Sequence, residues 1–137
     1  MILVREQLSW VKWLTVVWAV YAIVWISLEG MLWQVVMLGW GTTAVLLLHF
    51  FQRYLAERSF VLLAWLGITA VLGLIWGSSS VLFTLLSMAV KTGLHAHGPE
   101  FTPAEIEWVL GQALLWSLVG LLCGVGLGLL VAAQAKR

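Results

Sequence analysis

The sequence predicts an all-α integral membrane protein with four transmembrane helices and a short amphipathic helix between the third and the fourth. Of its 137 residues, 63% are hydrophobic and only 9% are charged, whereas soluble domains carry about 25% charged residues. Several segments are apolar on all sides over about 20 residues, which is the length that crosses the bilayer core. The Lys and Arg residues are also distributed unevenly among the segments that connect these spans.

The chain is predicted to form one membrane domain over residues 1–137. The expected spans cover about residues 10–28, 31–51, 59–76 and 104–133. The first span is expected to be retained rather than cleaved as a signal peptide, because it is rich in bulky side chains and lacks a small-residue cleavage site. The run Gly77-Ser78-Ser79-Ser80 is expected to end the third span.

Residues 80–93 are apolar but number only about 14, which is short for a crossing of the bilayer. Their polar side chains are Ser80, Thr84, Ser87 and Lys91, and this spacing places them in one stripe of an α-helix. We therefore expect an amphipathic helix that lies in the membrane interface. A re-entrant helix packed against the bundle is the alternative.

The positive charges decide between four and five spans. With four spans, one side receives every cationic residue except Lys91, namely Arg5, Lys12, Arg53, Arg58, Lys136 and Arg137. The positive-inside rule then predicts that both termini are cytoplasmic. The membrane itself is expected to be a bacterial inner or thylakoid-type membrane. The net charge of +1 gives no argument for binding of nucleic acid.

A polar run follows residue 91. Within it, Thr102, Pro103 and Glu105 have the pattern of a capping box with proline in the first helical turn, which predicts a helix start. Gly98 and the proline after it predict a turn.

Four residues of this run are not explained by folding: His95, His97, Glu100 and Glu107. The two histidines could bind a divalent metal ion, with a glutamate as a further ligand. We favour the other interpretation, in which these four residues form an exposed contact loop for a partner.

His49 is the one ionisable residue predicted to lie well inside a span. Such residues are candidates for function, and an imidazole could ligate a haem or a chlorophyll-type tetrapyrrole. A haem with two histidine ligands from one chain is disfavoured, because His95 and His97 are expected on the opposite side. Alternatively, His49 simply reaches the membrane interface from the end of the second span.

The last span carries small residues at every fourth position: Gly120, Gly124, Gly128 and Ala132. Small residues allow two helix backbones to approach closely in lipid, where the hydrophobic effect does not drive helices together. The stripe predicts either an interface with a partner subunit or packing against the first or second span of the same chain.

No motif of a known hydrolase, kinase or nucleotide-binding site is present, so we expect a protein that is not an enzyme. In general character, its Trp-, Leu- and Gly-rich spans and short loops resemble small subunits of bacterial respiratory or photosynthetic membrane complexes. The small-residue stripe, the many tryptophans, the short loops and the lack of catalytic motifs predict an accessory or assembly subunit whose partners are lipid and other membrane subunits. The alternatives are a tetrapyrrole-binding subunit that uses His49 and a small oligomeric transporter or channel.

Overall fold

The computed structural model describes residues 2–3, 10–28, 31–94, 98 and 100–135. Its helices are α1 (Trp10–Ser27), α2 (Leu32–Tyr54), α3 (Leu62–Leu94), α4 (Pro103–Gly111) and α5 (Ala113–Gln134), and its strands are β1 (Ile2–Leu3) and β2 (Ser59–Phe60). Four of these helices, α1, α2, α3 and α5, are long and apolar enough to cross a membrane. The predicted fold class is therefore confirmed.

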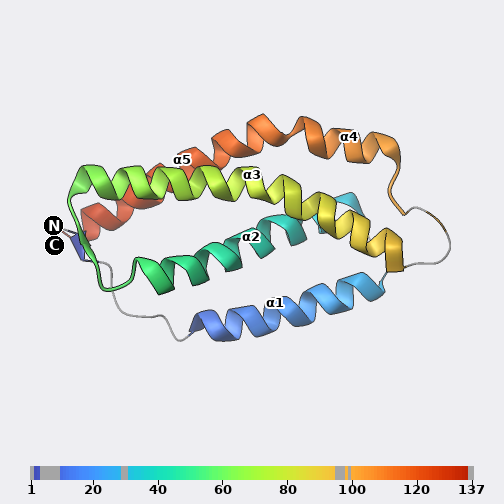
Figure 1. The fold of residues 1–137 in the computed structure, drawn as a ribbon, viewed down its shortest axis with the longest axis horizontal. Helices are drawn as coiled ribbons and strands as arrows, with labels where there is room; N and C mark the ends of the chain where they lie inside the picture. The colour runs from blue at the N-terminus through green and yellow to red at the C-terminus, as the bar shows by residue number, and fades with distance from the viewer. Residues whose placement is uncertain (1, 4–9, 29–30, 95–97, 99, 136–137) are drawn as a thin grey trace.

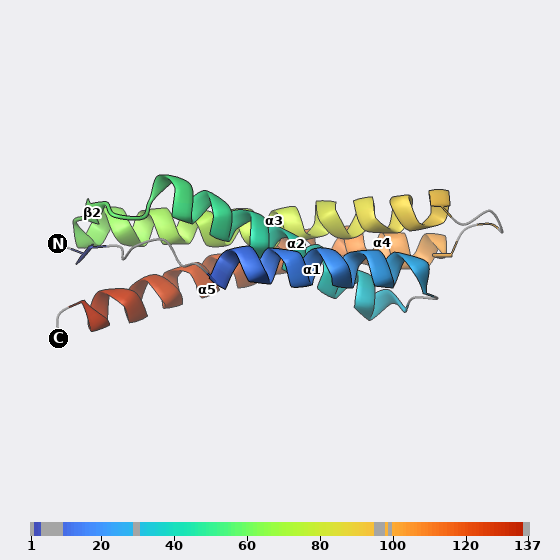
Figure 2. The ribbon, with the colours of Figure 1, turned by 90° about the horizontal axis from the view of Figure 1, so that it is seen from below.

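The long helices run alternately in opposite directions along an elongated bundle (Figure 1). The antiparallel pair β1–β2 and the last turn of α5 lie at one end, here called the termini end. Figures 1 and 2 show α1 at one edge of the bundle, with α2 and α3 between it and the α4–α5 pair. Since α3 contacts α2, α4 and α5, it is the central helix of the fold.

Helix α3 is one continuous helix of 33 residues, about 50 Å long at ~1.5 Å per residue. The predicted helix end at residues 77–80 is wrong, and so is the separate interfacial helix over 80–93. The serine hydroxyls find acceptors within the continuing helix: Ser78 donates to the Leu74 carbonyl at 2.9 Å and Ser80 donates to the Trp76 carbonyl at 2.7 Å. Bonds of this kind satisfy a hydroxyl within a helix that has no water around it.

The predicted polar stripe faces the interior of the bundle rather than the membrane interface. Ser80, Thr84 and Lys91 are all fully buried. Here α2 crosses α3 so closely that a Cβ added at Gly39 would overlap the Thr84 side chain and lie 2.8 Å from the Ser80 carbonyl oxygen. The stripe is therefore part of a helix contact.

The short helix between the third and fourth spans is α4 instead. Its start has the predicted capping box, in which the Glu105 carboxylate accepts from the Thr102 backbone N–H at 2.8 Å. The expected single span over 104–133 is divided at Gln112, whose N–H donates to the Val109 carbonyl three residues earlier. This tighter turn separates α4 from α5.

Helices α3 and α5 pack backbone against backbone. A Cβ added at Gly124 would overlap the Thr69 carbonyl oxygen and lie 2.9 Å from the Gly73 Cα, and one added at Gly120 would lie 2.7 Å from the Gly77 amide nitrogen. Every member of the predicted small-residue stripe is buried here: Gly120, Gly124, Gly128 and Ala132. The helix that covers the stripe is the third span of the same chain, not the first or second.

Tryptophan side chains fill the junction of α2, α3 and α5. The rings of Trp40 and Trp76 meet edge to face at a centroid distance of 5.1 Å, and the Trp116 ring lies 5.6 Å from that of Trp40. The Trp76 indole N–H donates to the Trp40 carbonyl at 3.1 Å, and the Trp65 indole N–H donates to the Gly128 carbonyl at 2.9 Å. These bonds satisfy polar N–H groups that water does not reach.

Candidate functional site: a buried lysine at the end of three segments

Lys91, in the last turn of α3, is the only charged residue with a fully buried side chain among the described residues. Its ammonium group donates to the Trp25 carbonyl oxygen at 3.2 Å and to the Leu28 carbonyl oxygen. These carbonyls belong to the C-terminal end of α1, where helical acceptors have no partner within the helix. Lys91 therefore caps a helix that is distant in sequence.

Two further groups stabilise the charge of Lys91. Its Nζ lies 3.4 Å from a carboxylate oxygen of Glu100, whose side chain is only 16% exposed. The same Nζ lies 4.3 Å from the centroid of the Trp25 ring, within the range of a cation–π interaction. A carboxylate, the negative end of the α1 dipole and an aromatic face thus surround one cation.

This arrangement joins three parts of the chain: α1, α3 and the segment before α4. An ammonium group has three N–H donors, and the two carbonyls and the carboxylate provide an acceptor for each. Chemically, the geometry suits holding these elements together rather than attacking a substrate. The indole nitrogen of Trp25, next to this ammonium group, is buried and has no hydrogen-bond partner among the described residues.

The structure separates the predicted loop residues. Glu100 pairs with Lys91, whereas Glu107 is exposed on α4. His95 and His97 lie outside the described residues. Within the part of the chain that is described, no three His, Cys, Asp or Glu side chains come together as a metal site.

His49 is exposed on α2, in the last two turns of that helix. Its Nε2 lies 2.7 Å from the hydroxyl oxygen of Thr15 on α1. The Thr15 hydroxyl also lies 2.8 Å from the Val11 carbonyl oxygen, to which it can donate. The direction of its bond with His49 therefore depends on the tautomer of the imidazole.

The role of Lys91 could not be deduced from sequence, although a signal for it exists. A polar stripe on a long apolar helix indicates a face that packs against other helices. The acceptors that satisfy Lys91 are backbone carbonyls of residues 25 and 28, and any residue type carries such carbonyls. Residue types alone therefore did not predict which helix covers the polar stripe of α3.

Comparisons of this chain with protein-family models, curated proteins and solved structures gave no match. Its function must therefore be argued from the geometry of its helices and side chains.

Proposed function

We propose that this protein is a small non-catalytic accessory or assembly subunit of a larger membrane complex and that it acts by helix–helix packing. The supporting observation is the contrast between α1 and the other spans. Within the chain, α1 buries only Val11 and Trp25 among its 18 residues. Much of the surface of α1 is therefore available to lipid or to a partner helix.

Although its surface is open, α1 is held at both of its ends and in the middle. Thr15 contacts His49, the Trp18 indole N–H donates to the Thr42 hydroxyl at 3.1 Å, and Lys91 caps the C-terminal end. A helix that is already positioned loses little conformational freedom when a partner packs against it. This preorganisation supports a docking role for α1.

The buried polar groups favour packing over transport. Thr43 donates to the Gly39 carbonyl at 3.0 Å and Thr84 donates to the Ser80 carbonyl at 2.7 Å, each within its own helix. Hydroxyls that are satisfied in this way do not offer their hydrogens to a solute. We propose a respiratory or photosynthetic complex as the setting, on the resemblance of the Trp-, Leu- and Gly-rich spans to small subunits of such complexes.

Site-specific photo-crosslinking in the host membrane tests this proposal. A photoreactive residue at Val17 or Ile23, which are 64% and 66% exposed on α1, should give one discrete protein adduct identified by mass spectrometry. The control position is Leu122 on α5, which is 70% exposed and should give mainly lipid adducts. Lipid adducts alone from both α1 positions would contradict the docking role.

A further inference from the structure

We propose that the face of α1 and α2 around the contact between Thr15 and His49 binds the phosphate group of an anionic lipid. Lys12 and Arg53 would hold the phosphate, and the Thr15–His49 pair would form the floor of the site. The proposal is independent of the partner subunit proposed above.

The contact between Thr15 and His49 sets the geometry. Lys12 lies three residues before Thr15 on α1, and Arg53 lies four residues after His49 on α2. Residues three and four apart share one face of a helix. Because α1 and α2 are antiparallel, both steps lead toward the same end of the pair. Lys12 and Arg53 therefore lie about one helical turn beyond the Thr15–His49 contact, each on its own helix.

Among the residues that the structure describes, no carboxylate pairs with the cations at this place. Lys12 and Arg53 are both exposed, and neither makes an ion pair with any residue that the structure describes. Lys12 also lies in the first turn of α1, where the helix dipole disfavours a cation. Helix formation therefore gives no reason for a lysine here, whereas a bound phosphate would.

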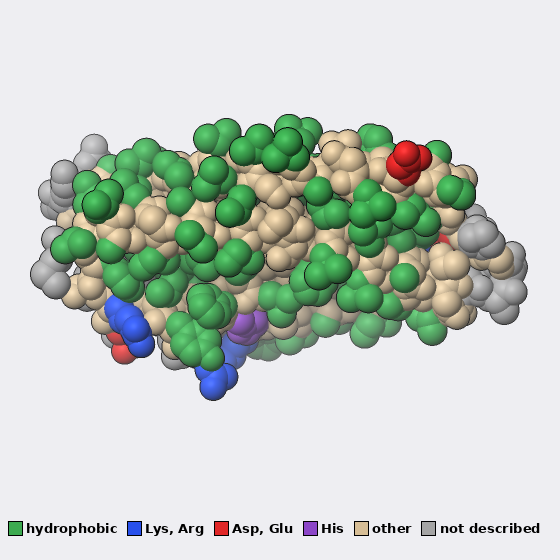
Figure 3. All heavy atoms as spheres, turned by 45° about the horizontal axis from the view of Figure 1, so that its top comes forward, with side chains coloured by type: hydrophobic (Ala, Val, Ile, Leu, Met, Phe, Trp, Pro, Cys, Tyr) green, Lys and Arg blue, Asp and Glu red, His purple; other side chains and the backbone are tan. Residues whose placement is uncertain are grey.

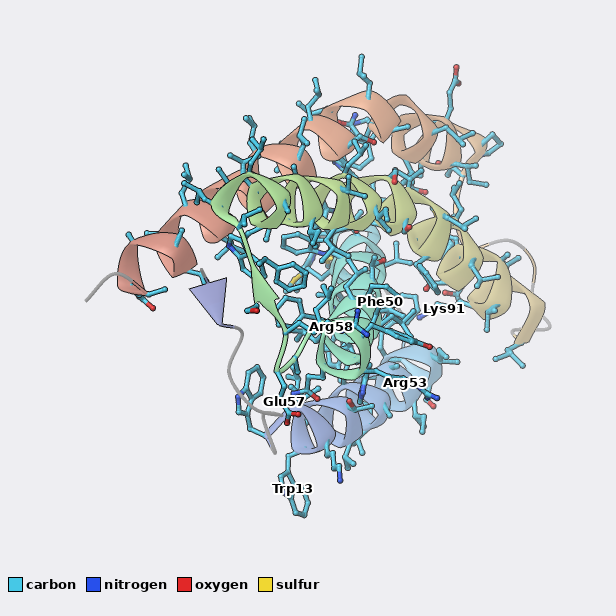
Figure 4. The ribbon with its side chains drawn as sticks, turned by 60° about the vertical axis from the view of Figure 1, so that its left-hand side comes forward. Trp13, Phe50, Arg53, Glu57, Arg58 and Lys91 are labelled. Atoms are coloured by element: carbon cyan, nitrogen blue, oxygen red, sulfur yellow. The ribbon has the colours of Figure 1, made fainter. Side chains whose placement is uncertain are left out.

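Figure 3 shows Lys and Arg side chains gathered beside a histidine on one face of the bundle, with hydrophobic side chains next to them. The described carboxylate that follows α2 is Glu57, which lies in the exposed turn after this helix together with Arg58 (Figure 4). With Lys12 and Arg53, the described charges at this place are three positive and one negative.

The aromatic neighbours favour a lipid over free phosphate. Phe50 is 46% exposed and its ring lies 4.9 Å from that of Tyr54. The Arg53 guanidinium lies 5.7 Å from the centroid of the Tyr54 ring. An apolar ring beside a cation at the end of a span suits a ligand with an acyl chain and a charged headgroup.

Native mass spectrometry of the purified full-length chain tests the site, with phosphatidylglycerol and phosphatidylcholine of equal acyl length as probes. The wild-type protein should retain phosphatidylglycerol preferentially. Lys12→Gln and Arg53→Gln should each weaken this binding about fivefold, as expected for one cation near a lipid phosphate. The matched control is Arg58→Gln, which removes the same charge at the same end and should have little effect.

Three outcomes would overturn the proposal. An equal loss in Arg58→Gln would indicate diffuse attraction rather than a site. Equal retention of the two lipids would show that the headgroup charge is not recognised. Complete displacement of phosphatidylglycerol by inorganic phosphate would indicate a site for a small anion.

If Lys12→Gln disturbs the packing of α1, the lipid binding of Arg53→Gln tests the proposal by itself, because Arg53 belongs to α2.

Discussion

The two helix pairs α3–α5 and α1–α2 are built differently, although all four helices are long enough to span a membrane. In α3–α5, glycines at matching depth bring one backbone against the other. In α1–α2, glycine meets a side chain: a Cβ added at Gly41 would overlap the ring of Trp18. A side chain can rotate away whereas a packed backbone cannot, so the first pair should be the more rigid.

The difference indicates that one helix pair provides rigidity while the other keeps a surface open for contact. In lipid, close packing and interhelical hydrogen bonds hold helices together. The α3–α5 pair has the closer backbone packing, and the Trp65 indole N–H bonds across it to the Gly128 carbonyl. The α1–α2 pair relies on side-chain bonds instead, between Thr15 and His49 and from Trp18 to Thr42. The α1–α2 pair has fewer contacts and keeps its outer surface open, which suits a helix that docks to a partner.

The largest effect is expected from Gly124→Leu. The new side chain would meet the α3 backbone at Thr69 and Gly73, so α3 and α5 would have to separate, at a cost of about 3 kcal/mol or more. Thermal unfolding in detergent, followed by circular dichroism, measures this loss. The control Gly126→Leu makes the same change on the same helix where the glycine faces open space. An equal loss in the control would show that the α3–α5 contact is not the cause.

Lys91→Met should have an intermediate effect, because it breaks the link between α1 and α3. It leaves the carboxylate of Glu100 and the carbonyls of Trp25 and Leu28 without their shared donor. We expect a loss of about 2–3 kcal/mol in the same unfolding measurement, somewhat less than the ~3–5 kcal/mol for a fully buried pair.

A double-mutant cycle sharpens this prediction. Combined with Glu100→Gln, Lys91→Met should cost less than the sum of the two single changes, since each removes the same ion pair. Lys12→Met, which removes an exposed lysine, should cost little. Strict additivity of Lys91→Met and Glu100→Gln would show that the two groups do not interact.

The smallest effect is expected from Gly41→Ala, which should destabilise the protein by about 1 kcal/mol less than Gly73→Ala. The added methyl group meets the Trp18 side chain in the first case and the α5 backbone in the second, and a side chain can adjust further than a packed backbone. Gly67→Ala, in open space on α3, corrects both for the gain in helix propensity of up to ~1 kcal/mol. If Gly41→Ala costs as much as Gly73→Ala, the proposed difference in rigidity between the two pairs is wrong.

Prediction from sequence succeeded where the signal was local or periodic. The capping box at Thr102 and Glu105 needs only neighbouring residues, and the structure has it. The stripe that includes Thr84 and Lys91 follows from helical periodicity, and these residues do share one buried face. The stripe was assigned to the wrong environment because periodicity shows which residues share a face but not what covers that face.

The sequence by itself determined that the chain forms four long apolar helices and which side chains share a helix face, because hydropathy, spacing and capping act within one segment. Only the tertiary structure decided that α3 continues through Gly77, that Gly124 packs against α3 and that Lys91 caps α1. The physical reason is that the effect of glycine and serine on a helix depends on what surrounds the helix. In water they often end a helix, whereas against a neighbouring helix glycine permits close approach and serine bonds to its own backbone.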